Sequence, residues 1–80
     1  MNHYVITFNS INDALKAEKL TAALGGAIIP IPSEISADCG FALRLNDLEA
    51  TRKILKAEFE SFETYKVSGK GVSRIIKKIV

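Results

Sequence analysis

Residues 4–32 read YVITFNSINDALKAEKLTAALGGAIIPIP, and in this stretch a strand pattern is followed by a helix pattern. Residues 4–8 combine β-branched and aromatic side chains, which predicts a strand that is buried on both faces and central in a sheet. Residues 11–24 consist mainly of good helix formers, and Ser10 and Asp13 predict the N-terminal cap of this helix. The stretch therefore begins with a β-α unit.

A second strand is predicted after two glycines. Gly25 and Gly26 predict the end of the helix, because glycine accepts the left-handed conformation that a C-cap requires. Residues 27–32 are apolar but include Pro30 and Pro32, which cannot donate hydrogen bonds to a neighbouring strand. We therefore expect this strand at an edge of the sheet.

The rest of the chain predicts two further strands around a second helix. Residues 39–45 alternate between the two faces of a strand. The inward face of that strand carries Phe41, Leu43 and Leu45. Asn46 and Glu49 predict a capping box at the start of the second helix. The core face of this helix carries Leu48, Leu55, Phe59 and Phe62. Residues 62–67 then predict a strand, whereas residues 72–80 fit either a short helix or an extra strand.

These elements predict an α+β fold of the ferredoxin-like type. The order β-α-β-β-α-β suits a four-stranded antiparallel sheet, with both helices packed on one face and the strands in the order 4-1-3-2. We expect residues 1–67 to form this domain and residues 68–80 to form a basic C-terminal appendix, which packs on the domain or serves in dimerisation. The opposite face of the sheet is then open or used by a partner.

Composition excludes several classes of protein. The chain has 80 residues, of which 48% are hydrophobic and 25% are charged, so it fits one ordinary globular domain. A single Cys and a single His exclude a disulfide framework and a zinc site within the chain. No apolar run approaches the roughly 20 residues of a membrane span, and the N-terminus carries no signal-peptide pattern. We expect a cytoplasmic protein without metal, cofactor or membrane contact.

The net charge of +2 conceals an uneven distribution. Residues 1–63 carry six basic and nine acidic side chains, whereas residues 64–80 carry five basic side chains and no acid. A basic end attracts anionic partners, but this one lacks the interleaved aromatic residues that favour nucleic acid. Solubility alone also accounts for the charge, so the sequence does not favour nucleic acid as the partner.

Cys39 is the residue with clear nucleophilic potential. It follows a polar connector, so its thiol can reach the rim of the domain, and the neighbouring Gly40 lets another molecule approach. Ser33 and Ser36 offer hydroxyl donors to a thiolate, whereas the adjacent Asp38 disfavours the thiolate. The alternative is a buried Cys39 that packs as a small hydrophobic residue, in a small regulatory or ligand-binding module of the same fold.

Three segments of the chain carry a resemblance to a known family. They read FNS at residues 8–10, ALKAEKL at residues 14–20 and IPIPSEISADCGFALR at residues 29–44. Together they resemble the selenium/sulfur carrier-like family of small bacterial and archaeal domains, most specifically in the Ser-x-Asp-Cys-Gly pattern of residues 36–40. The resemblance implies that Cys39 carries a persulfide or selenopersulfide. It also implies that this group is framed by Ser36, Asp38 and Gly40.

The same resemblance implies two protein partners. A cysteine desulfurase-like donor would supply sulfur or selenium and a protein acceptor would receive it, so the chain would be a carrier rather than an enzyme. A carrier needs a thiolate on an exposed loop, but neither a cofactor nor a large pocket. A homodimer formed through residues 72–80 is a further expectation.

Overall fold

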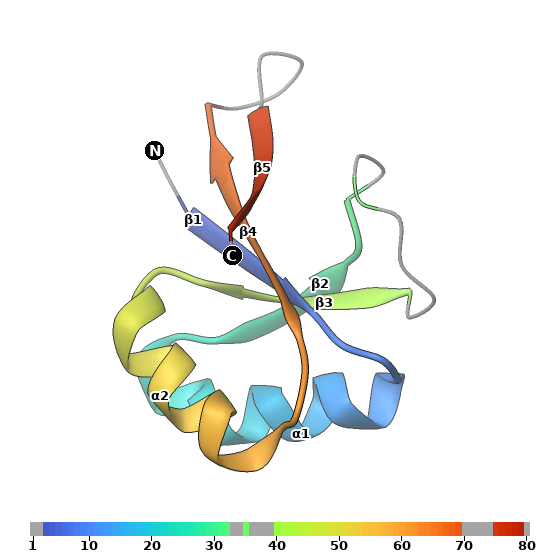
Figure 1. Cartoon of the computed structure of the whole chain (residues 1–80), viewed down its shortest axis with the longest axis vertical. Helices are drawn as coiled ribbons and strands as arrows, with labels where there is room; N and C mark the ends of the chain where they lie inside the picture. Colours follow the sequence, from blue (N-terminus) through green and yellow to red (C-terminus); the bar gives the residue numbers. More distant parts are fainter. Residues whose placement is uncertain (1–2, 33–34, 36–39, 70–74, 80) are drawn as a thin grey trace.

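Figure 1 shows how the helices and strands are arranged in space. The computed structural model describes residues 3–32, 35, 40–69 and 75–79. In chain order the elements are β1 (His3–Thr7), α1 (Ile11–Thr21), the short 3-10 helix η1 (Ala22–Leu24), β2 (Ala27–Pro30), β3 (Phe41–Leu45), α2 (Leu48–Glu58), β4 (Glu63–Ser68) and β5 (Ile75–Ile79).

The five strands form one antiparallel sheet in the order β2-β3-β1-β4-β5. The first four strands therefore lie in the predicted order. The sheet has five strands instead of the predicted four, because residues 75–79 pair with β4 as an additional strand. Pairing with β4 gives the backbone of these residues its hydrogen bonds, and their isoleucines suit a pleated surface.

The two predictions about strand position are confirmed. β1 is central, and its neighbouring residues Val5 and Ile6 are fully buried although they point to opposite faces. β2 lies at the edge of the sheet, so no outer strand requires the backbone N–H that Pro30 lacks. The backbone N–H of Ile28 donates to the carboxylate of Glu18 on α1 at 3.0 Å. This contact ties the edge strand to the helix beside it.

The first helix begins and ends as the sequence predicts. The Ser10 side chain accepts a hydrogen bond from the backbone N–H of Asp13 at 3.2 Å. The helix ends in a 3-10 turn, and Gly25 caps that turn with φ of 84°, in the left-handed region. A side chain at the next position, Gly26, would collide with the hydroxyl of Thr21. The face of α1 toward the sheet carries Ala14, Ala17 and Thr21, and the small size of these residues lets the helix lie close to the sheet.

The second helix differs from the prediction at its start. Asn46 lies outside the helix, and Asp47 is the cap, because its carboxylate accepts the backbone N–H of Ala50 at 3.2 Å. The negative charge of Asp47 also suits the positive end of the helix dipole. The predicted capping box with Glu49 is therefore wrong. The helix ends at Glu58, so Phe59 and Phe62, which are predicted on its core face, lie beyond its end.

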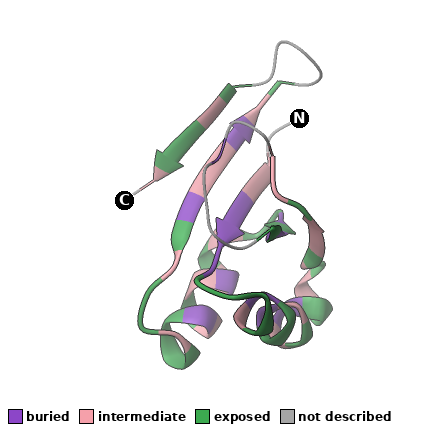
Figure 2. Ribbon diagram, turned by 90° about the vertical axis from the view of Figure 1, so that its right-hand side faces the viewer, coloured by how far each residue is buried: buried purple, intermediate pink, exposed green. Residues whose placement is uncertain are grey.

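Both helices pack on one face of the sheet, as predicted. A single cluster of buried side chains joins the two helices to that face, and Figure 2 shows the buried residues where helices and strands meet. Its members are Ile6, Phe8, Ala14, Ala17, Leu43, Leu45 and Leu55. Phe41 is predicted in this core but is 38% exposed and lies outside the cluster, at the very start of β3.

The other face of the sheet is also buried at its centre. Val5, Ala42 and Val67 are at most 1% exposed there, and Ile35 packs on them from the segment between β2 and β3. Ile76 of β5 packs against the same cluster. This face is therefore covered in part by the chain itself, whereas the sequence predicts a face that is open or in contact with a partner.

An ion pair joins β5 to the start of β4. The ammonium group of Lys78 lies 2.8 Å from the carboxylate of Glu63. Hydrogen bonding to Glu63, and then its charge, raise the pKa of Lys78 above its ordinary value of 10.5. Because the pKa is higher in the folded chain, the pair stabilises the fold below pH 10.5 and loses that contribution as the pH rises through the folded pKa.

Candidate functional site

The residues predicted to form the site lie between β2 and β3. Of these, Gly40 belongs to the described residues, whereas Cys39, the predicted hydroxyl donors Ser33 and Ser36, and Asp38 lie outside them. The described residues on either side of the segment, and Ile35 within it, define where the segment meets the sheet.

The two ends of the β2–β3 segment, residues 31–40, are held together at the edge of the sheet. Pro30 and Phe41 are partners in the β2–β3 ladder. One step further, the backbone N–H of Ile31 donates to the carbonyl of Gly40 at 3.0 Å. The segment thus leaves and re-enters the sheet at adjacent points, and Cys39 is covalently next to one of them.

Ile35 fixes the middle of the same segment. Its side chain is 5% exposed and packs with Val5, Ala42 and Val67 on the face of the sheet away from the helices. Its backbone N–H donates to the carbonyl of Pro32 at 3.0 Å, which forms a tight turn. The sequence pattern places this residue in a polar connector and does not predict its burial. Its one signal is a single large apolar side chain within a polar stretch.

Gly40 borders open space. A Cβ atom built on it would have no atom within 4 Å among the described residues, and its backbone is outside the left-handed region. Phe41, the next residue, presents a partly exposed aromatic ring. Among the described residues, neither packing nor backbone conformation therefore requires glycine at this position, and no described side chain crowds it.

This geometry predicts different outcomes for two glycine substitutions. Gly40→Ala should leave the free energy of unfolding unchanged or raise it by about 0.4–1 kcal/mol, because alanine restricts the unfolded chain. Gly25→Ala should lower it by about 1–2 kcal/mol, because alanine is strained at positive φ. Urea unfolding of the two variants measures both effects. Destabilisation by Gly40→Ala comparable to that of Gly25→Ala would contradict the open environment of Gly40.

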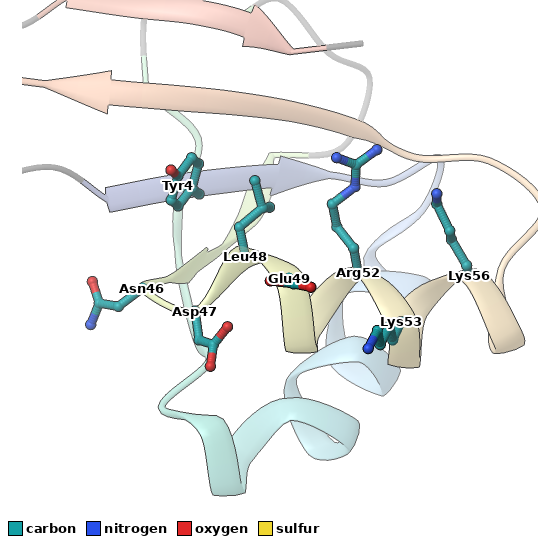
Figure 3. A pocket seen from close by; sticks show the side chains of 8 residues that line it. All are labelled: Tyr4, Asn46, Asp47, Leu48, Glu49, Arg52, Lys53 and Lys56. Carbon is teal, nitrogen blue, oxygen red and sulfur yellow. The ribbon is translucent and has the colours of Figure 1, made fainter.

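A second feature, which the sequence pattern does not predict, is a groove along α2. A pocket of about 740 Å³ opens beside the start of this helix, and Figure 3 shows its lining side chains. They are Tyr4, Asn46, Asp47, Leu48, Glu49, Arg52, Lys53 and Lys56. The pocket combines one aromatic residue with charges of both signs, and no single motif in the sequence marks it.

The described residues contain neither a cluster of metal ligands nor a membrane-spanning helix. No group of three or more His, Cys, Asp or Glu side chains suitable for a metal ion occurs within the part of the chain that the structure describes. In that same part, no helix has the length and apolar character needed to cross a membrane.

Comparison with known proteins identifies the family. A family model described as "Putative Se/S carrier protein-like" matches residues 3–67, which is most of the chain. The chain belongs to this family. The region shared with the Se/S carrier family includes β1 to β4 nearly complete and the segment that contains Cys39, and it ends before β5. No curated protein matches the chain, and no solved structure matches it either.

Proposed function

We propose that the chain is a carrier of sulfur or selenium that holds the transferred atom on Cys39 as a persulfide or selenopersulfide. The observation that carries this proposal is membership of the Se/S carrier family over residues 3–67, a region that contains the only Cys of the chain. The thiol is the side chain here that can form a labile bond to either element.

The surroundings of Cys39 support the proposal. The β2–β3 segment is closed at its base by the hydrogen bond between Ile31 and Gly40 and is anchored in its middle by Ile35. These fixed points on either side of Cys39 in the sequence lower the conformational entropy that docking has to remove. No atom of the described residues would crowd a side chain at Gly40, which favours the approach of a partner protein at this rim.

The transfer of sulfur from a donor persulfide to Cys39 needs no external oxidant or reductant. The Cys39 thiolate attacks the outer sulfur of a persulfide on the donor protein, and the S–S bond of the donor breaks as a new S–S bond forms on Cys39. The donor leaves as a thiolate, and the transferred sulfur keeps its proton and its oxidation state. An acceptor nucleophile later takes the outer atom and releases the Cys39 thiolate. We assign the donor role to a cysteine desulfurase-like protein in the cytoplasm.

The fold is suited to a carrier that docks successively on two proteins. We infer that β1 to β4 and the two helices form a ferredoxin-like core, which β5 extends at one edge. The strand order, the antiparallel pairing and the position of both helices on one face support this assignment. A rigid sheet of this kind holds the β2–β3 segment at one rim and leaves the other surfaces available for docking.

The proposal is tested by loading the protein with sulfur. Reduced protein is incubated with a cysteine desulfurase and cysteine, and the intact mass is measured before and after treatment with a thiol reductant. We expect a gain of one sulfur atom on the peptide that contains Cys39, and its removal by the reductant. The same experiment with a selenium donor tests selenopersulfide formation. A chain that gains neither atom, while its native thiol resists iodoacetamide, would contradict the carrier function and favour a structural Cys39.

A further inference from the structure

The groove along α2 continues past the first pocket. A second pocket of about 380 Å³ opens further along the helix, and both pockets are lined by Arg52 and Lys56. The second pocket also reaches the cross-strand pair Thr64 and Ile79, on β4 and β5. Figure 3 shows the side chains of Arg52 and Lys56 rising from α2 toward β4. We call the two pockets together the α2 groove; one side is the helix and the other is the helix-side face of β1, β4 and β5.

A pair of lysines lies on the strand side of this groove. Lys66 is the cross-strand partner of Tyr4, which lines the first pocket, and it lies two residues from Thr64, which lines the second. On its other side Lys66 faces Lys77 of β5 directly. Like charges directly opposite each other destabilise a sheet. Among the described residues neither lysine has an acidic partner within ion-pair distance, so this repulsion is not compensated within them.

Arg52 provides a second and independent sign of a missing anion. Its Nε is buried but has no hydrogen-bond acceptor among the described residues. A buried donor without an acceptor is destabilising, and Arg donors are suited to carboxylates. Arg52 is also shared by the two pockets, so an acceptor placed there would lie at the middle of the groove.

The charges along the groove follow a pattern. The cations Arg52, Lys53 and Lys56 line the groove, while acidic side chains line its parts near either end of α2. Lys66 lies on the same face of β4 as Thr64, which lines the second pocket. The acids are Asp47 and Glu49 at the start of the helix and Glu60 after its end. Apolar surface is provided by Leu48, Phe59, Phe62 and Ile79. The pattern from one end to the other is therefore negative, positive and negative, over a partly apolar floor.

We propose that the α2 groove binds an acidic, partly apolar polypeptide segment of a partner protein, whose carboxylates lie between Arg52, Lys56 and the lysine pair. A peptide can present acids at its centre, apolar side chains toward the floor and basic residues at its ends, which matches all three parts of the pattern. A nucleic acid carries negative charge along its whole length. It would meet the acidic side chains at both ends of the groove.

The location of the groove suits a carrier, although binding there does not depend on transfer at Cys39. The strand side of the groove is formed by Tyr4 of β1 and by β4 and β5, whereas Gly40 lies at the rim formed by β2 and β3. Tyr4 pairs with Leu45, which lies at the opposite end of β3 from Gly40. A partner segment seated in the α2 groove therefore leaves the rim at Gly40 uncovered.

Lys66→Glu tests the proposal with two readouts of opposite sign. The new carboxylate faces Lys77, so an ion pair replaces a repulsion and the melting temperature of the free protein should rise. The same change removes a cation from the groove and adds an anion. Binding of a fluorescent probe peptide, with alternating Glu and Leu between terminal lysines, should weaken about tenfold. Fluorescence anisotropy at fixed ionic strength measures this binding.

The controls separate the groove from its alternatives. Lys19→Glu makes the same change of net charge at an exposed site on α1 and should leave peptide binding within about twofold. Cys39→Ser should bind the peptide as the natural chain does, so loss of sulfur transfer and loss of docking are distinguishable. Equal weakening by Lys19→Glu and Lys66→Glu would overturn the proposal. Tighter binding of a single-stranded RNA homopolymer than of the peptide, lost in Lys66→Glu, would also overturn it.

Discussion

Cys39→Ser should lose all acceptance of sulfur from a cysteine desulfurase persulfide while its free energy of unfolding stays within about 0.5 kcal/mol of the natural chain. A serine hydroxyl has nearly the size of a thiol and makes similar hydrogen bonds, but it cannot form a persulfide at neutral pH. Mass spectrometry after incubation with the desulfurase measures the first effect, and urea unfolding measures the second. The pair of measurements is decisive because the two hypotheses for Cys39 predict opposite results.

A structural Cys39 would give the reverse pattern. Serine in an apolar site would bury a hydroxyl without a partner and lower the free energy of unfolding by about 1–3 kcal/mol. The thiol of the native protein would then react with iodoacetamide only after unfolding. Clear destabilisation together with a protected thiol would therefore contradict the carrier function, and so would a Cys39→Ser variant that still acquires sulfur.

The strands and helices are largely predictable because local chemistry and the fold agree for most of the chain. β1 contains residues that suit burial on both faces, and it is central. Ser10 and Gly25 mark the two ends of the first helical stretch through capping contacts between close neighbours in sequence. Pro30 marks an edge strand because proline lacks an N–H. Each of these signals acts over a few residues, so the sequence displays it directly.

The predictions from sequence are wrong or undecided where two residues or two kinds of secondary structure fit the local sequence equally well. Asn46 and Asp47 are both strong N-cap residues, and the side chain that meets the backbone N–H of Ala50 is that of Asp47. Residues 75–79 have no decisive periodicity, and their pairing with β4 is a contact that the order of residues within the strand does not reveal. Phe41 has the alternation of a core residue, but it is 38% exposed at the start of β3, which the alternation within the strand does not predict.

The candidate site is only partly predictable for the same reason. Cys39 and Gly40 are conspicuous in the sequence because thiols are rare and glycine permits close approach. Ile35 and the α2 groove are not conspicuous, since each depends on contacts across the sheet. Lys66 and Lys77 become neighbours only through the register of β4 and β5, and Arg52 shares a pocket with Thr64 and Ile79 only because α2 packs on that face.

Ile35→Ala should lower the free energy of unfolding by about 2–4 kcal/mol, a large share of the margin of so small a domain. Ile35 is 5% exposed on the face of the sheet opposite to α1 and α2, so neither of these helices can move to close the cavity. Ile75→Ala removes the same atoms from a residue that is 57% exposed, and it should cost less than about 0.5 kcal/mol. Urea unfolding compares the two variants directly.

Ile35→Ala also tests whether Ile35 anchors the β2–β3 segment in addition to stabilising the fold. Leu55→Ala should destabilise the fold to a similar extent, because Leu55 is fully buried between the helices and the sheet. Under conditions where both variants are folded, however, the rate of sulfur acceptance should fall in Ile35→Ala and stay unchanged in Leu55→Ala. Ile35→Val, which keeps most of the buried side chain, should restore most of that rate. Equal rates in Ile35→Ala and Leu55→Ala would show that Ile35 supports the fold without positioning Cys39.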